Sequence, residues 1–153
     1  MFKKSILFLA LILITACSSS LKVLELPQSK IESQLFVITQ QSPKSEKSLL
    51  AIEFQPEQWR WVQTDPLGAP ISRLILNKKG WQNDGFLMPN KQAQQLFAAI
   101  ATYLSPTVIF DVQNKDNQYM KNNQFMWQLS PQKNGVIIEL EDNSIWLVEP
   151  IAS

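Results

Sequence analysis

The chain contains no histidine and a single cysteine among its 153 residues. The absence of histidine removes the side chain that serves most often as a general base and as a metal ligand near neutral pH. One cysteine excludes an internal disulfide. Only four glycines are present, and they form no glycine-rich loop that could hold a phosphate. We therefore expect a protein with no catalytic site, no metal and no cofactor.

The charge balance is close to neutral. The 14 basic residues fall to 12 once Lys3 and Lys4 are removed with the leader described next, against 13 acidic residues. A chain with so small a net charge lacks the basic surface that binding to nucleic acid requires. The hydrophobic content of 45% is ordinary for a globular protein. We expect one small domain that does not bind nucleic acid.

The leader has the organisation of a bacterial export signal. Lys3 and Lys4 precede an apolar run over 6–14 that is too short to span a bilayer comfortably. The run ends in Ile-Thr-Ala-Cys-Ser at 14–18, which resembles the lipobox of bacterial lipoproteins and holds the only cysteine of the chain. The alternative is an ordinary secretory signal with a chance cysteine at this place.

The lipobox resemblance implies a cleaved and acylated N-terminus. It implies a signal peptide over 1–16, acylation of Cys17 by palmitate-type chains, and a lipidated N-terminus and tether over 17–28. Several acyl chains give near-permanent anchoring, because each buried methylene contributes about 0.8 kcal/mol. Serines rather than an aspartate follow Cys17. By resemblance to enterobacterial sorting rules, this favours the periplasmic face of the outer membrane.

A hairpin is predicted around a short polar turn. Trp59 and Trp61 fall on one face of an extended run, and a second alternating run follows the turn. The turn is Asp-Pro-Leu-Gly, in which Pro66 presets φ and Gly68 supplies a positive φ. Leu67 therefore stands at the tip of the hairpin. The sequence leaves open whether it folds back onto the hairpin or is displayed to a partner.

Short strands and one helix account for the rest of the chain. Further strands are predicted over 34–39, 48–55, 81–87, 124–129, 135–141 and 144–148, with a polar loop over 114–123. A helix is predicted over 91–104, between the N-cap residue Asn90 and Pro106. Its apolar residues follow the helical i, i+3, i+4 spacing: Ala93, Leu96, Phe97, Ile100, Ala101 and Leu104. The pattern predicts a single α+β domain over 29–153, in which a curved antiparallel sheet holds one amphipathic helix against its concave face.

The apolar stripe of this helix has two interpretations. It packs on the sheet as an ordinary core, or it covers a cavity in the sheet as a lid. The five tryptophans suit both interpretations, since a cavity for an apolar ligand also uses such side chains. The cavity interpretation predicts a lining of Trp59, Trp61, Trp81, Leu96, Phe97 and Ile100.

The run over 59–77, W-R-W-V-Q-T-D-P-L-G-A-P-I-S-R-L-I-L-N, resembles the central hairpin of the LolB family. These are outer-membrane lipoproteins that receive other lipoproteins from a periplasmic carrier. The run is more similar still to short LolB-like lipoproteins associated with aryl-polyene biosynthesis clusters. The resemblance implies the LolA/LolB fold, an incomplete β-barrel whose helices plug a cavity for acyl chains. It also implies a LolA-like carrier as a partner, and a membrane or cargo-transfer role for the turn of Pro66, Leu67 and Gly68.

Two functions remain open at this point. The first is a non-catalytic lipoprotein that binds lipid-like or acylated cargo, a lipoprotein or a polyene-type lipid, and transfers it into the outer membrane. The chain is shorter than the receptors of the family and has only one convincing helix, which favours the smaller, lipid-like cargo. The second is an accessory or scaffold subunit of an envelope assembly, with a filled core and no ligand cavity. A continuous cavity would favour the first function, and a filled core with an exposed apolar patch the second.

Overall fold

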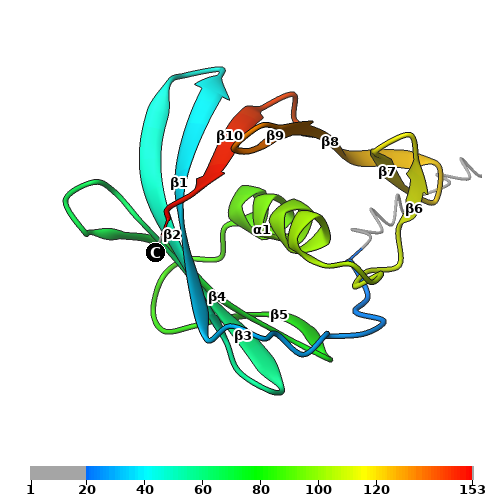
Figure 1. Ribbon diagram of the computed structural model, residues 1–153, viewed down its shortest axis with the longest axis horizontal. Helices are drawn as coiled ribbons and strands as arrows, with labels where there is room; N and C mark the ends of the chain where they lie inside the picture. Colours follow the sequence, from blue (N-terminus) through cyan, green and yellow to red (C-terminus); the bar gives the residue numbers. More distant parts are fainter. Residues whose placement is uncertain (1–19, 153) are drawn as a thin grey trace, which may run out of the picture.

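The computed structural model describes residues 20–152, which form an open sheet of ten strands around one helix (Figure 1). The predicted signal peptide and the predicted lipidation site, Cys17, lie outside the described residues. In chain order the elements are β1 (Ser33–Ser42), β2 (Glu46–Phe54), β3 (Gln58–Thr64), β4 (Pro70–Asn77), β5 (Gly80–Asn83), α1 (Lys91–Leu104), β6 (Gln113–Lys115), β7 (Gln118–Lys121), β8 (Gln124–Gln132), β9 (Gly135–Leu140) and β10 (Ile145–Pro150).

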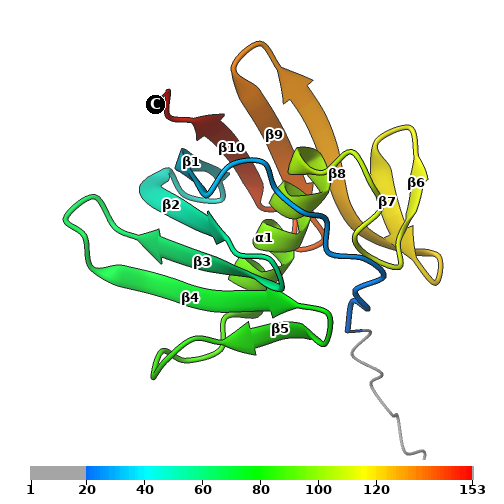
Figure 2. The same ribbon diagram turned by 60° about the horizontal axis from the view of Figure 1, so that its bottom comes forward.

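All neighbouring strands pair antiparallel, in the spatial order β5-β4-β3-β2-β1-β10-β9-β8-β7-β6. The pairing of β1 with β10 joins the two halves of the sheet. The edge strands β5 and β6 do not pair with each other, so the sheet curls around α1 without closing (Figures 1 and 2). This architecture confirms the predicted α+β class, with a curved antiparallel sheet and a helix on its concave side.

The helix α1 has the predicted bounds because its start and its end are fixed locally. Asn90 Oδ1 accepts a hydrogen bond from the backbone N–H of Ala93 at 3.0 Å, which satisfies one free donor of the first turn. Pro106 follows closely and cannot continue a helix. The predicted apolar stripe is buried or partly buried, and Ala98 and Ala99 are fully buried as well. The helix is therefore enclosed on more than one side, because the sheet curls around it.

Two predicted segments are wrong in their secondary structure. The polar run over 114–123 is largely a hairpin, formed by β6 and β7, rather than a loop. Its tight turn places Asp116 and Asn117 at φ values of 53° and 65°, which Asn and Asp tolerate better than most residues. The strand predicted over 81–87 ends at Asn83, and a loop over 84–90 leads into α1. Gly85 in this loop has a φ of 90°, which a continuing strand does not allow.

The first described residues, 20–27, lie within the predicted tether and form a strap against the domain. Val23 is only 8% exposed and makes an antiparallel bridge with Phe110. The backbone N–H of Leu24 donates to the carbonyl oxygen of Ile109 at 2.7 Å. The strap therefore packs beside the segment that follows α1, and these tether residues are part of the folded structure.

Asp111 fixes the strap through its carboxylate. Oδ1 accepts a hydrogen bond from the backbone N–H of Lys22 at 2.7 Å, and Oδ2 lies 2.8 Å from Lys121 Nζ. The same ammonium group donates to the carbonyl oxygen of Ser20 at 2.6 Å. Partial burial raises the pKa of Asp111, but the hydrogen bonds from Lys121 and Lys22 and the charge of Lys121 outweigh it and leave the pKa below its usual value.

We expect Asp111→Asn to lower the free energy of unfolding by about 1–2 kcal/mol at neutral pH, because it removes the partner of a partly buried ammonium group. Folding lowers this pKa, so the stabilisation exists above the unfolded pKa and is lost as the pH falls through the folded pKa. Urea unfolding at neutral pH and well below the folded pKa measures the effect. The gap between variant and wild type should close in acid. A difference in unfolding free energy of the same size at both pH values would contradict the role of this carboxylate. The control is Glu57→Gln, which changes an exposed residue.

Candidate functional site

Aromatic side chains form a continuous row on the concave side of the sheet, and α1 contributes to it. The rings of Trp61 in β3 and Phe97 in α1 stack with centroids 5.2 Å apart. The ring of Trp81 in β5 lies 5.6 Å from Trp61 and 6.2 Å from Phe97. The aromatic row consists, in spatial order, of Phe54, Trp59, Trp61, Phe97, Trp81, Phe110, Trp127 and Tyr119, with neighbouring centroids at most 6.5 Å apart. It runs from β2 in one half of the sheet to β7 in the other.

The six residues predicted to line a cavity come together in one cluster. Trp59, Trp61, Leu96, Phe97 and Ile100 are at most 3% exposed, and Trp81 is partly buried. Their side chains fill the space between α1 and the sheet in this state. Leu96 and Trp81 also border the two hollows described below. The core is therefore filled at these positions, with openings at its margins.

Four tryptophans in the aromatic row bury an indole N–H that has no acceptor among the described residues. These are the Nε1 atoms of Trp59, Trp61, Trp81 and Trp127. The fifth tryptophan, Trp146, lies outside the row, and its Nε1 donates to Ser144 Oγ at 2.8 Å. A buried donor without a partner costs about 1–3 kcal/mol, and contact with an aromatic face recovers only part of this. The closed core thus leaves a line of unused donors between α1 and the sheet.

Hydrogen bonds tie α1 to one half of the sheet. Gln95 donates to the backbone of β8 at 2.9 Å, Tyr103 to the backbone of β9 at 3.4 Å, and Gln92 to Asp142 in the β9–β10 turn at 2.7 Å. Toward β3, β4 and β5, residues 91–104 make no side-chain hydrogen bond within the described part of the chain, and the helix is tied to this half through its N-cap residue, Asn90, which donates to Ser72 Oγ in β4 at 3.4 Å. The contacts of Phe97 with Trp61 and Trp81 face that half. The weaker boundary of α1 is therefore the apolar one, along β3 to β5.

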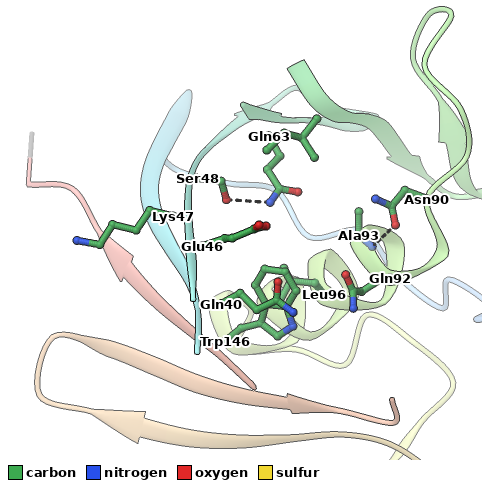
Figure 3. A pocket seen from close by; sticks show the side chains of 11 residues that line it. Gln40, Glu46, Lys47, Ser48, Gln63, Asn90, Gln92, Ala93, Leu96 and Trp146 are labelled. Atoms are coloured by element: carbon green, nitrogen blue, oxygen red, sulfur yellow. Dashed lines mark hydrogen bonds between the residues drawn. The ribbon is translucent and has the colours of Figure 1, made fainter. Parts of the chain in front are cut away.

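One hollow lies at the N-terminal end of α1 (Figure 3). It has a volume of about 130 Å³, and we call it the mouth. Its floor includes Leu96 and Trp146, and its polar wall includes Ser48 and Gln63, which are joined by a hydrogen bond of 2.9 Å from Gln63 Nε2 to Ser48 Oγ. The mouth is a hollow with a mixed polar and apolar lining, beside the buried core to which Leu96 and Trp146 belong.

A second hollow of about 550 Å³ runs along α1 on the side where the sheet is open. Its lining combines Trp81 and Met126, from opposite halves of the sheet, with Gln94 and Gln95 of α1. Because β5 and β6 do not pair, no strand of the described structure closes this side of the helix, and the strap contributes Ser20 and Leu21 to the lining of the hollow. The hollow gives Trp81 a route to solvent.

The turn between β3 and β4 displays Leu67 instead of folding it back. Leu67 is 95% exposed. Asp65 Oδ1 accepts hydrogen bonds from the N–H groups of Leu67 and Ala69, each at 2.9 Å, and Gly68 takes the positive φ of 91° that the turn needs. The turn is therefore a defined structure with an apolar side chain at its tip, which answers the question that the sequence left open.

A second apolar site lies near this turn, in the loop over 84–90. Phe86 and Met88 in this loop are fully and 84% exposed, respectively. The loop lies beside the beginning of β4, since Asp84 is 3.3 Å from Arg73 Nη2 and Asn90 Nδ2 donates to Ser72 Oγ. Figures 1 and 2 show the turn and the loop toward the left of the molecule, while the described chain begins at the right. We call Leu67, Phe86 and Met88 the apolar tips.

We expect Leu67→Glu to change the free energy of unfolding by no more than about 0.5 kcal/mol, because an exposed leucine contributes little through burial. If the apolar tips meet a lipid surface, the same change should reduce transfer of a bound fatty-acid analogue to vesicles at least tenfold, while binding persists. Thermal unfolding and a vesicle-transfer assay measure the two effects. Ala69→Glu adds the charge in the same turn without removing the leucine, and should have the smaller effect. Unimpaired transfer by Leu67→Glu would remove the membrane role of this turn.

Other signs of function are sparse in the described residues. No helix within 20–152 has the length and apolar character needed to cross a bilayer. The same range contains no group of three or more acidic residues or cysteines placed to hold a metal ion. Comparison of the chain with protein-family models, with curated proteins and with solved structures found no match.

Proposed function

We propose that this chain is a non-catalytic, lipid-anchored protein of the outer membrane that takes up a lipid-like or acylated ligand between α1 and the sheet and passes it on. The observation that carries the proposal is the line of four buried indole N–H groups without acceptors. Buried polar groups in proteins are nearly always paired, so four exceptions in one row call for a partner. A ligand with an acyl chain and ester or carboxyl oxygens supplies both apolar contact and acceptors.

A filled core is compatible with this function. An empty cavity destabilises a protein by roughly 24 cal/mol per Å³, so a vacant site of a few hundred Å³ would cost several kcal/mol. A helix that settles onto the aromatic row in the absence of ligand avoids this cost. We interpret the packing of Phe97 against Trp61 as the unliganded state of such a site.

In this proposal, α1 separates from the sheet along its apolar contact with β3 and β5. Three hydrogen bonds hold α1 to the β8–β10 half, whereas its contact with β3 and β5 is aromatic. Parting α1 from β3 and β5 breaks no side-chain hydrogen bond of residues 91–104 within the described structure, and the bond of the N-cap residue Asn90 runs to Ser72 in β4. It exposes Trp61 and Trp81 with their free donors to an entering chain.

The sequence resemblances support the cellular setting of the proposal. The lipobox at Cys17 resembles that of lipoproteins sorted to the outer membrane, and the Trp59–Asn77 hairpin resembles LolB receptors. By that resemblance, a LolA-like carrier delivers the cargo. The display of Leu67 at the tip of the turn agrees with a transfer role.

The position of the anchor adds a condition to transfer. Only two residues separate Cys17 from Ser20, so the three steps of chain between them span at most about 11 Å. Ser20 is fixed by Lys121, while the apolar tips lie toward the opposite end of the molecule. With the strap bound, the tips therefore face away from the anchoring membrane and toward a carrier. Delivery into that membrane requires release of the strap.

The alternative is an accessory or scaffold subunit of an envelope assembly. The filled core and the exposed apolar tips favour it, because such tips also suit a protein partner. In that case the aromatic row is structural, and no lipid enters it.

Tryptophan emission separates the two functions. A fatty-acid analogue should change the emission saturably, with low-micromolar affinity, equivalent to about −8 kcal/mol. Trp61→Phe removes one free indole N–H and should weaken binding several-fold. Trp146→Phe is the matched control, since the N–H of Trp146 already has a partner, and it should leave the affinity nearly unchanged. Unmoved emission across several lipid classes would favour the scaffold function.

A further inference from the structure

The buried polar side chains of the described chain gather at the mouth. Ser48, Gln63, Ser72 and Ser144 are the four buried polar residues within 20–152. Ser48 and Gln63 line the mouth directly. Ser72 and Ser144 are each hydrogen-bonded to a residue that lines it, namely Asn90 and Trp146. The apolar core therefore has a polar collar at one place, the entrance beside α1.

This collar has hydrogen-bonding capacity that the protein does not use. Gln63 is only 5% exposed, and its single described side-chain bond runs from Nε2 to Ser48 Oγ. Oε1 has no donor among the described residues, and the hydroxyl hydrogen of Ser48 remains free to donate. Figure 3 shows both side chains at the hollow. Gln63 Oε1 is not among the buried polar atoms that lack a partner, so a ligand or water in the hollow can reach it and complete its hydrogen bonding.

The lining of the mouth carries one acidic and one basic residue, Glu46 and Lys47, and therefore offers an anion no net positive charge. Lys47 is the single basic residue in its lining, and its side chain runs away from the hollow in Figure 3. Glu46 also lines the mouth, paired with the exposed Lys44 at 2.7 Å. Asp142 lies nearby, bound by Gln92. Burial raises the pKa of Asp142, but the hydrogen bonds from Ser144 and Gln92 outweigh this effect and leave the pKa below its usual value. This carboxylate is therefore charged at neutral pH.

We propose that the mouth binds an uncharged, hydroxyl-bearing headgroup of the glyceryl or glycosyl kind, and discriminates against a phosphate headgroup. The inference rests on the proposed uptake of an acylated ligand, because the floor at Leu96 and Trp146 leads into the apolar core. Amide and carboxylate oxygens accept from hydroxyl groups, whereas a phosphate brings no donor and meets carboxylates. The volume of about 130 Å³ has room for several water molecules and hence for a small polyol.

The test titrates the full-length protein, held in lipid nanodiscs, with four probes that share an octyl chain: monooctanoylglycerol, octyl glucoside, octyl phosphate and octanol. Binding is read from tryptophan emission, with empty nanodiscs subtracted. We expect the glycerol or glucose probe, or both, to bind at least tenfold more tightly than the phosphate and the alcohol. The tighter of the two identifies the source of the hydroxyl groups.

Substitutions in the polar collar test whether its side chains cause the preference for the hydroxyl-bearing probes. Gln63→Leu should remove the tenfold preference and leave octanol binding unchanged, and Ser48→Ala should reduce the preference about threefold. Gln132→Leu, at an exposed glutamine of β8, should change neither. Melting temperatures check that each variant is folded. Equal binding of all four probes, or tightest binding of octyl phosphate, would overturn the headgroup site while leaving lipid uptake in place. Failure of every probe to bind would overturn both.

Discussion

Replacing Phe97 by alanine is expected to lower the free energy of unfolding by about 3–5 kcal/mol, the usual range for deleting a fully buried aromatic side chain. Phe97 is not exposed at all, stacks on Trp61 at 5.2 Å and lies 6.2 Å from Trp81. Its loss leaves a cavity between α1 and the sheet that the neighbouring aromatic rings cannot fill. Urea unfolding followed by circular dichroism measures the change.

Gln94→Ala is the matched control on the same helix. Gln94 is partly exposed, so its replacement should shift stability by no more than about 0.5 kcal/mol. Adding an amphiphile that binds to the Phe97→Ala variant should recover part of the lost stability, since a ligand in the cavity stabilises the folded state by mass action. A loss of less than about 1 kcal/mol in Phe97→Ala would show that α1 does not pack on the aromatic row in solution.

Replacing Cys17 by alanine is expected to abolish acylation completely. If the run over 14–18 is a lipobox, the thiol is the acyl acceptor and no other cysteine can take its place. The precursor should also remain uncleaved by the lipoprotein signal peptidase. Incorporation of radiolabelled palmitate, together with the shift in mass on cleavage, measures both effects.

Ser18→Ala is the neighbouring control and should retain the label, because its hydroxyl group is not the acceptor. Absence of label on the wild-type protein would end the lipoprotein interpretation. Label that persists in Cys17→Ala would place the acyl group elsewhere and contradict the predicted site.

The helix and the central hairpin could be predicted from the sequence because local chemistry decides them. Asn90 and Pro106 fix the ends of α1, and the period-two alternation through Trp59 and Trp61 fixes the faces of β3. The β6–β7 hairpin could not be predicted in this way. Its strands have three and four residues, carry no apolar alternation and depend on Asn and Asp residues at positive φ.

The sequence predicted which residues of the candidate site come together, but not whether they line a cavity or fill the core. Trp61 and Phe97 each follow a local period, and both face the core as predicted. The joining of Phe110 and Trp127 to the row depends on pairing between distant strands and on the strap, which no local pattern encodes. Whether α1 fills or covers the concave face depends on how closely helix and sheet approach. Phe86 was missed because the strand predicted over 81–87 hid the loop that exposes it.

Native mass spectrometry of the chain beginning at Ser18, without the acylated cysteine, tests most directly whether the core takes up lipid. If α1 parts from the aromatic row to admit an acylated ligand, the protein should retain an adduct with the mass of a lipid from the host membrane. That adduct should weaken in Trp61→Phe and persist in Trp146→Phe. Detection of the bare protein alone, both as purified and after incubation with a total membrane lipid extract, would contradict the account.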